Sequence, residues 1–328
     1  MSLREFHIEI ILSMVSPTIA LCIPAYNAVD FLPRLLESAR QQDPPFDEII
    51  VCVDASPDAT ADVAKAFGVT VIVNETNQGC SASKNRALQA ATSDWIHFHD
   101  ADDVLLPNFT KLASNWAGKQ DCPDVVLFDY EYRDNTTNEL IDASNFLPEE
   151  LENDPIRYAI LHQINPFCGL YRRSKLMELG GYDTDPEILY NEDVAFHCKL
   201  ALAGMTFGVE KERSIINYRI AGSMSQANQR KCMLAHCAVM RRVAAVVGST
   251  YPSEIASRFW AAATILATVS DWTAMDRALE DARKVNQGVP TNQSREFAKL
   301  CRLLGVKLAF RFREHSIRLL KPQLRNTK

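Results

Sequence analysis

The chain has 328 residues, of which 47% are hydrophobic and 23% charged, and its formal net charge is −6. This length suffices for one large domain or two small ones with a buried core, and the acidic balance argues against a nucleic-acid-binding protein. The nine cysteines form no CxxC pair, which predicts reduced, buried thiols in a cytosolic protein. No run approaches the roughly 20 apolar residues that a membrane-spanning helix needs.

The first residues are expected to form an extension ahead of the folded part. Their apolar run is interrupted by Glu9, and no convincing small-residue cleavage site follows, which argues against a signal peptide. We expect residues 1–13 to be loosely attached. Residues 1–16 therefore form an N-terminal extension, and the first domain begins at residue 17.

Short apolar runs then alternate with helical patterns. We expect strands at residues 18–24, 48–54, 70–74 and 95–100, and helices at 29–42, 58–67 and 81–91. This alternation predicts a parallel sheet with helices on both faces. In such sheets ligands bind at the carboxyl ends of the strands. Pro24 to Asn27, Asp54, Asp100 and Asp102 all follow strands in this way, which indicates a site at one edge of the sheet.

The rest of the chain changes character near residue 227. Before that point we expect strands at 124–133, 167–173 and 214–220 and helices at 154–163 and 192–204. After it the pattern is helical to the end, with no strand signal. The sequence therefore predicts a domain over residues 17–226 followed by a helical region over 227–328.

The stretch WIHFHDADD (95–103) ends an apolar strand in a cluster of carboxylates. Asp100 and Asp102 are two residues apart, so on an extended segment both side chains lie on one face. Two carboxylates held together repel each other, and a divalent cation removes that conflict. Oxygen ligands suit Mg²⁺ or Mn²⁺ together with substrate phosphates. The alternative is a solvated acidic turn, because turns favour Asp in any case.

Several stretches follow one known pattern in order and spacing. EIIVCVDASPDAT (48–60) resembles EIIVVDDGSTDGT, and NQGCSASKNRALQAATSDWIHFHDADD (77–103) resembles N.G.s.aRN.gl..A.Gdyi.flDaDD. LMELGGYD (176–183) and YNEDVAFHCKLALAG (190–204) resemble l..iGgyde....EDw.l..rl...G, and YRIAGSMS (218–225) resembles YR.h..S.S. These are motifs of the family 2 glycosyltransferases. The resemblance implies a GT-A fold, a mostly parallel sheet sandwiched by helices, here with a helical C-terminal extension.

The resemblance also implies a donor site. Pro24, Ala25 and Tyr26 match positions that line the nucleotide pocket. Asp54 matches a residue that contacts the base, which points to uracil and a UDP-sugar donor. The remaining matches are Lys84, a basic position near the donor, and the DXD pair Asp100 and Asp102, with Asp102 as the direct ligand of Mn²⁺ or Mg²⁺.

The catalytic residues implied by the resemblance lie further along the chain. Asp193 matches the catalytic base, and Glu192 would support the acceptor site. These roles agree with the chemistry, because a metal stabilises the departing diphosphate as a Lewis acid and a carboxylate takes the proton of the attacking hydroxyl. The implied enzyme is an inverting hexosyl- or N-acetylhexosaminyltransferase of cell-surface polysaccharide biosynthesis.

The chain departs from the family pattern at three positions. Val53 replaces the first acidic residue of the base-binding pair, which leaves the nucleotide less certain. Ser93 stands where glycine is common, and Ala221 stands near a histidine that helps hold the metal in many members. Three histidines could substitute as ligands, although packed or hydrogen-bonded roles are the preferred interpretation: His97, His99 and His197.

The end of the chain is basic and interleaved with apolar residues. From Arg295 to Lys328 there are ten Lys/Arg against two Glu. This pattern is typical of an amphipathic helix on an anionic membrane, and the alternative is a cationic outer face on a packed helix. The first interpretation predicts that the protein lies at the cytoplasmic face of the membrane. It also predicts that the acceptor is a glycan or a lipid-linked glycan.

The same residues are also compatible with other functions. A glycosyltransferase-like protein that binds a nucleotide sugar without efficient catalysis remains open because of Val53 and Ala221. DADDVL (100–105) also fits the first motif of haloacid-dehalogenase-like phosphatases, in which the first aspartate is a nucleophile. In that family the motif lies on the first strand, whereas here three strand–helix units precede it. A dinucleotide-dependent oxidoreductase or a uridylyltransferase would need a glycine-rich loop after the first strand, which is absent.

Overall fold

The structure is a computed structural model that describes residues 16–220, 227–288 and 293–325. Its contacts divide the chain into two compact units. The first contains Met1–Pro155, Ile164–Thr184 and Lys199–Ala221, and the second contains Ile156–Gln163, Asp185–Cys198 and Gly222–Lys328. The second unit therefore takes in two short segments that precede residue 227. The extension at 1–13 and Ala221 lie outside the described residues.

The first unit begins with the predicted parallel strands. In the order in which they lie side by side, they are β3 (Thr70–Val73), β2 (Glu48–Val53), β1 (Ile19–Ala25) and β4 (Trp95–Phe98). β1 and β4 are almost wholly buried, as expected for strands covered on both faces. The three connecting helices are α2 (Leu32–Arg40), α3 (Thr60–Ala66) and α4 (Cys80–Ala90). All seven elements were predicted within a few residues of their ends.

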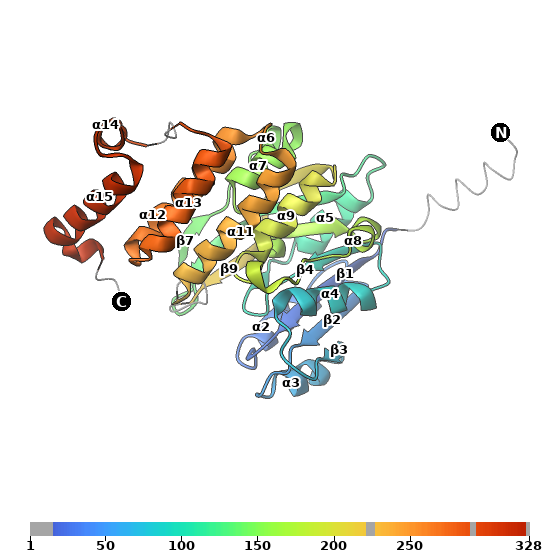
Figure 1. Cartoon of the computed structure of the whole chain (residues 1–328). Helices are drawn as coiled ribbons and strands as arrows, with labels where there is room; N and C mark the ends of the chain where they lie inside the picture. The colour runs from blue at the N-terminus through green and yellow to red at the C-terminus, as the bar shows by residue number, and fades with distance from the viewer. Residues whose placement is uncertain (1–15, 221–226, 289–292, 326–328) are drawn as a thin grey trace, which may run out of the picture. The chain divides into compact units, whose positions relative to one another are not determined.

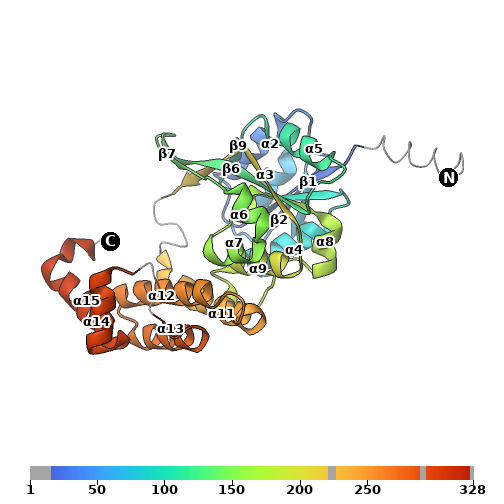
Figure 2. The same ribbon diagram turned by 90° about the horizontal axis from the view of Figure 1, so that it is seen from above.

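The direction of the crossovers decides which face each helix covers. From β1 the chain moves outward to β2 and β3, and then returns to place β4 on the other side of β1. Because such crossovers are right-handed, α2 and α3 lie on one face and α4 on the other, where it packs on β1 and β2 (Figures 1 and 2). The strand order reverses between β1 and β4, and ligands of open α/β sheets bind beside such a reversal.

The second half of the same sheet is mixed. β8 (Gly169–Arg172) is antiparallel to both β4 and β6 (Val125–Asp134), whereas β9 (Phe207–Arg219) is parallel to β6. Two short strands complete the sheet, both antiparallel to their neighbours: β5 (Val104–Leu105) on β9 and β7 (Leu140–Ala143) on β6. The sequence missed β5, β7 and the first half of β9, because these segments are very short, exposed or rich in charge.

Four short helical segments complete the first unit. They are α5 (Phe109–Ala117), α6 (Pro148–Asn153), η1 (Pro166–Cys168) and α8 (Arg173–Leu179). α5 lies on the same face of the sheet as α2 and α3, and α8 lies on the face of α4 (Figure 2). All nine cysteines of the chain are free and seven are buried, as predicted.

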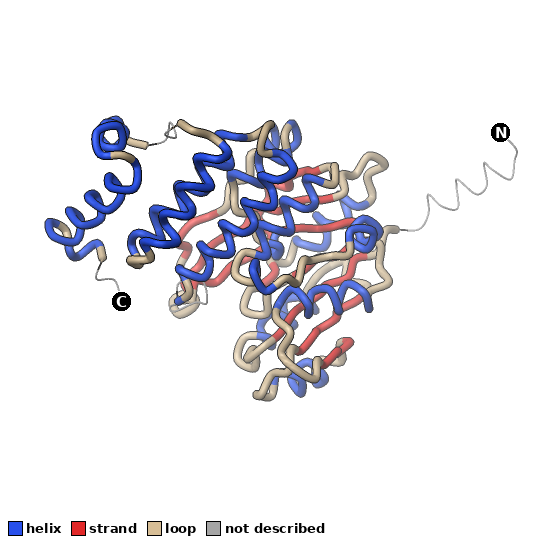
Figure 3. Tube along the Cα trace, in the orientation of Figure 1, coloured by secondary structure: helices blue, strands red, loops and turns tan. Residues whose placement is uncertain are grey.

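The second unit is helical, and its described residues contain no strand, as predicted for the chain after residue 227 (Figure 3). Its segments are α7 (Pro155–Leu161, apart from its first residue), η2 (Pro186–Ile188), the first two turns of α9 (Glu192–Leu202), α11 (Gln229–Val247), α12 (Pro252–Thr268), α13 (Trp272–Val285), α14 (Arg295–Leu304), α15 (Val306–Leu320) and η3 (Pro322–Leu324). Among all described helices, none has the length and apolarity that crossing a bilayer requires.

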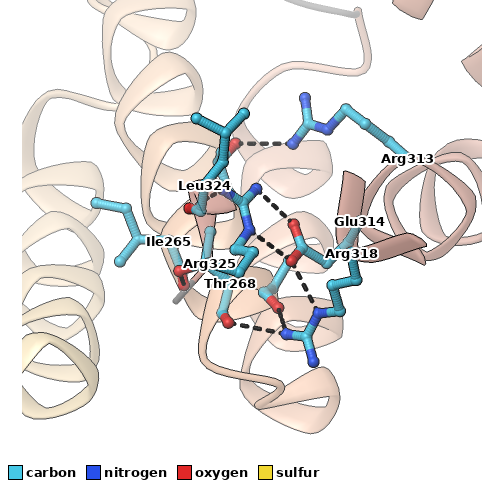
Figure 4. A network of polar contacts seen from close by, with 9 residues as sticks. Ile265, Thr268, Arg313, Glu314, Arg318, Leu324 and Arg325 are labelled. Atoms are coloured by element: carbon cyan, nitrogen blue, oxygen red, sulfur yellow. Dashed lines mark hydrogen bonds and ion pairs between the residues drawn. The ribbon is translucent and has the colours of Figure 1, made fainter. Parts of the chain in front are cut away.

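One buried carboxylate fixes the orientation of α15. Glu314 is 2% exposed and accepts hydrogen bonds from Arg318 Nε at 3.0 Å and from Arg325 Nε at 2.7 Å (Figure 4). Burial opposes ionisation, but the hydrogen bonds from the two guanidinium groups outweigh it and hold the pKa of Glu314 below its usual range. On the same face, the Phe310 ring lies 5.4 Å from that of Trp260 and 5.2 Å from that of Phe297. One face of α15 is therefore packed.

Candidate active site

The ends of three strands bring the predicted donor residues to one edge of the sheet. Ala25 pairs with Val53 in the register of β1 and β2, so Tyr26 and Asp54 leave the sheet side by side. β4 ends at the same edge, where Asp100 follows it two residues later. Tyr26 is 50% exposed, whereas the Ala25 side chain is buried. Ala25 can therefore contribute mainly through its backbone.

Asp54 holds the loop that follows β3. Its Oδ1 accepts hydrogen bonds from Asn74 Nδ2 at 2.6 Å and Gln78 N at 2.9 Å, and its Oδ2 accepts one from Gly79 N at 2.7 Å. A carboxylate has about four acceptor positions, so one position on Oδ2 remains. Asp54, which is 4% exposed, is thus a structural anchor of this loop.

The loops after β1 and β2 are tied to each other by side-chain oxygens. Asn27 N donates to Ser56 Oγ at 2.8 Å, and Ala28 N donates to Thr60 Oγ1 at 2.9 Å. Asp58 accepts from Val29 N and from Thr60 N at the start of α3. Burial opposes its ionisation, but the hydrogen bonds from Thr60 and Ser56 prevail and lower the pKa of Asp58 to about 2. Asp58 therefore ties the loop after β1 to the start of α3.

Two residues beside the donor positions have left-handed backbones without being glycine. They are Asn27, with φ 51°, and Ala55, with φ 53°. Asn tolerates this region, whereas a Cβ without a polar side chain makes it costly for Ala. The family pattern has glycine at the position of Ala55. Backbone strain of this kind concentrates at functional sites.

Replacing Ala55 with Gly is expected to raise the free energy of unfolding by about 1 kcal/mol, because glycine adopts this conformation without steric cost. Chemical denaturation of the purified protein measures the change. Ala61, in the first turn of α3, provides the control: Ala61→Gly should lower the stability by about 0.5–1 kcal/mol. Equal losses from both substitutions would contradict the strain at Ala55.

The three carboxylates of the acidic turn after β4 have different contacts. Asp100 Oδ1 lies 3.4 Å from Nζ of Lys84, which is only 2% exposed on α4. Asp103 is 1% exposed and accepts from Asn217 Nδ2 at 2.7 Å and from Tyr218 N at 2.9 Å on β9. The carboxylate of Asp103 therefore anchors the turn to the sheet, and it is not available to a ligand.

Arg34 of α2 holds the middle of this turn, a role that the sequence analysis did not predict. Its Nη2 donates to the backbone oxygen of Asp102 at 2.8 Å and to Asn135 Oδ1 at 3.1 Å, and its guanidinium lies 3.8 Å from the centre of the Tyr218 ring. Burial and the charge of Asp100 raise the pKa of Asp102 above its usual value, while Arg34 partly offsets them. The turn thus presents a carboxylate whose charge is poorly compensated.

The oxygen ligands that remain in this turn fit a divalent cation that the substrate also helps to hold. With Asp103 engaged, the turn offers the carboxylates of Asp100 and Asp102. Within the part of the chain that the structure describes, no group of three His, Cys, Asp or Glu side chains could hold a metal by itself. One or two protein carboxylates completed by phosphate oxygens and water suit Mg²⁺ and Mn²⁺.

The glycine pair after α8 brings Tyr182 to Lys84. Gly181 has φ 65°, and a Cβ there would lie 2.3 Å from Asn85 Oδ1. This close approach lets Asn85 accept from Tyr182 N at 2.7 Å and donate to Tyr182 O at 2.9 Å. The Lys84 ammonium lies 5.3 Å from the centre of the Tyr182 ring. The glycines therefore shape the loop around the buried lysine.

The three histidines are packed and hydrogen-bonded, as the sequence analysis predicts. His97 Nδ1 lies 2.9 Å from Gly169 O, and His97 Nε2 lies 3.0 Å from His99 Nδ1. Both rings are fully buried; burial lowers the pKa of His99 to about 3, with a smaller effect from the charge of Lys84. His197 is also buried, with its Nδ1 2.9 Å from Asp193 O.

Glu192 and Asp193 belong to the second unit and form the first turn of α9. The predicted helix at 192–204 is confirmed, and both side chains are partly exposed. The N-terminus of a helix carries a partial positive charge that stabilises a nearby carboxylate. Asp193 lies in the first turn of α9, beside this partial positive charge.

The fold and the sheet edge define a GT-A type protein with a helical C-terminal region, as predicted. The chain is similar in fold to TarS of S. aureus, solved in complex with UDP-GlcNAc, with a TM-score of 0.66, 19% identity and 92% of each chain covered. It is also similar to the mannosyltransferase PcManGT of Pyrobaculum calidifontis, solved with GDP-Man and Mn²⁺ (TM-score 0.52, 16% identity, 94% and 88% covered).

Residues 20–180 match the sequence model described as Glycosyl transferase family 2. Over these residues the match confirms the resemblance to the family 2 glycosyltransferases. It is 30% identical to EpsH of Bacillus subtilis (strain 168) over 171 residues, which cover 50% of this chain and 49% of that protein. The first three curated relatives are matched over 49%, 31% and 59% of their own length.

Proposed function

We propose that this protein transfers a sugar from a UDP-sugar to a hydroxyl group of a glycan or lipid-linked glycan, with inversion at the anomeric carbon. The observation that carries the proposal is the cluster at the sheet edge: Asp100 and Asp102 with the buried Lys84, beside the reversal of strand order. Residues 17–226 would carry the chemistry, and residues 227–328 would form a separate helical region.

The donor base is assigned to the edge formed by β1 and β2. Asp54 has one acceptor position left on Oδ2, which suits the N3–H of uracil, and the exposed ring of Tyr26 leaves the sheet beside it. The UDP-GlcNAc in the TarS structure supports a uridine nucleotide. The GDP-Man in PcManGT makes guanine the competing base.

The diphosphate is assigned to the acidic turn and Lys84. Asp102, with support from Asp100, would hold Mn²⁺ or Mg²⁺, which would offset the negative charge of the departing diphosphate. Lys84 is held at the same place by Asp100 and by the Tyr182 loop, so its ammonium is oriented before a donor binds. Arg34 keeps the backbone of Asp102 in position.

Asp193 is assigned the role of general base and Glu192 that of orienting the acceptor. The base removes the proton of the acceptor hydroxyl as its oxygen forms a bond to the anomeric carbon, and the bond to the diphosphate breaks. In a single displacement the hydroxyl attacks from the side opposite the leaving group, so an α-linked donor gives a β-linked product. A hexose or N-acetylhexosamine would be moved, in cell-surface polysaccharide biosynthesis on the cytoplasmic side.

Two alternatives make different predictions. A nucleotide-sugar-binding protein without efficient catalysis would bind UDP and Mn²⁺ but release no UDP from the sugar. A haloacid-dehalogenase-like phosphatase would need Asp100 as a nucleophile at the end of the first strand. Here Asp100 follows β4 and is paired with Lys84, so the phosphatase is disfavoured.

A thermal-shift series with UDP, GDP, dTDP and CMP, each with Mn²⁺ or Mg²⁺, tests the donor assignment. UDP with metal is expected to raise the melting temperature, because a ligand that binds only the folded state stabilises it by mass action. The other nucleotides should have smaller effects. A clear shift with GDP and none with UDP would overturn the assignment of uracil to Asp54 and Tyr26.

A further inference from the structure

The outer face of the last two helices carries large apolar side chains. Leu308, Phe312 and Leu319 of α15 are 58%, 57% and 73% exposed. Their spacing places them along one side of the helix, away from the packed face of Phe310 and Glu314. Leu304, at the end of α14, is 38% exposed. These four residues are called the apolar stripe below.

A groove accompanies the apolar stripe. It has a volume of about 560 Å³ and is lined by Leu304, Leu308 and Phe312 together with Trp272 of α13. Arg311 and Arg318 also line it, so its apolar wall is bordered by cations. Exposed apolar side chains gathered beside a polar rim are typical of an interaction site.

The same two helices concentrate positive charge. Residues 295–328 contain ten of the 35 Lys/Arg of the chain but two of its 41 Asp/Glu. Some of these cations are neutralised within the protein: Lys307 lies 2.6 Å from Glu280 and Arg311 lies 2.7 Å from Asp276. Four others have side chains that form no hydrogen bond or ion pair with any residue that the structure describes: Arg295, Lys299, Arg302 and Lys321.

We propose that α14 and α15 dock the protein on an anionic lipid surface. The segment combines exposed apolar side chains with unpaired cations, and this combination matches the boundary between acyl chains and phosphate headgroups. Charge decides against a second copy of the chain, because a symmetric contact would bring two strongly cationic segments together. This proposal does not depend on the identity of the donor, and it goes beyond the proposed transfer reaction.

Vesicle flotation of the full chain tests the proposal. The parent is expected to float with vesicles of phosphatidylcholine mixed with phosphatidylglycerol, to bind phosphatidylcholine alone far more weakly, and to be released by salt. Arg302→Ser with Lys321→Ser should weaken binding about 30-fold, because each cation near an anionic surface contributes about a factor of five. Leu308→Ser with Phe312→Ser should weaken it at least about tenfold.

The matched control is Leu140→Ser with Ile141→Ser on β7, which are 55% and 56% exposed in the first unit. This variant should float like the parent. All the altered side chains are exposed, so thermal unfolding should be nearly unchanged. Parent protein that does not bind phosphatidylglycerol vesicles, or stripe variants that bind like the parent, would overturn the proposal. The proposal would also be overturned if the protein self-associated and did not bind vesicles, and if Phe312→Ser abolished that self-association.

Discussion

Asp193→Asn is expected to lower sugar transfer by about 10²–10⁴-fold, the usual contribution of a positioned general base. Asparagine keeps the size of the side chain and its ability to cap a helix, but its amide cannot take the proton of the acceptor hydroxyl. Binding of UDP and Mn²⁺ should stay at the level of the parent. The loss is measured as the release of UDP from the donor, either with an acceptor or with water in place of the acceptor.

The control for Asp193 is another carboxylate that begins a helical segment in the second unit. Asp185 accepts from Glu187 N at 2.9 Å at the start of η2 and pairs with Arg242. Asp185→Asn should leave transfer near the level of the parent. If Asp193 served only to cap α9, its Asn variant would also stay active, because Asn and Asp cap helices about equally well. A product with retained anomeric configuration would likewise contradict the mechanism.

Asp102→Ala is expected to abolish the stabilisation that UDP and Mn²⁺ give together. Asp100→Ala should weaken it less, because Asp100 is already paired with Lys84 at 3.4 Å. The unliganded Asp102→Ala protein should be at least as stable as the parent, since burial and Asp100 make the charged form of Asp102 unfavourable. Thermal shifts with and without Mn²⁺ measure both effects.

Asp103 provides the contrast within the same turn. Its carboxylate accepts from Asn217 and Tyr218 on β9, so Asp103→Ala should lower stability by leaving those donors unpaired. The melting temperature of the unliganded protein should therefore fall in Asp103→Ala but not in Asp102→Ala. The turn is not the metal site if the Asp102→Ala and Asp100→Ala proteins both bind metal and nucleotide like the parent.

The order of strands and helices in the first unit could be predicted because each element has a strong local signal. β1 and β2 are apolar runs, and α2 between them repeats apolar residues at helical spacing. β7 lacks such a signal, since its apolar residues Leu140 and Ile141 are exposed. Its pairing with β6 is decided by the neighbouring strand and not by its own sequence.

Within the candidate site, residue types could be predicted but not their partners. The acidic run does not reveal that Asp103 accepts from Asn217, because 114 positions separate the two residues. For the same reason, Arg34 gave no signal of its contact with Asp102. The three hydrogen bonds that fill most of the Asp54 carboxylate arise from a loop that only the fold brings near.

The basic end of the chain packs through one face of α15, and its contact with a membrane stays a proposal. α15 packs through Phe310 and Glu314, yet Leu308 and Phe312 on its other side remain exposed. Apolar and cationic residues interleave along α15 in sequence, so pattern alone could not tell which apolar positions were buried. The ion pairs of Glu314 decide this by fixing how the helix is turned.

The most direct test of the central claim is the release of UDP from UDP-GlcNAc and related UDP-sugars in the presence of Mn²⁺. The account predicts metal-dependent release by the parent that EDTA stops, and strong loss of release in both Asp102→Ala and Asp193→Asn. Metal-dependent binding of UDP without release by the parent would contradict a transferase. Release that is unchanged in both variants would contradict the assignment of the site.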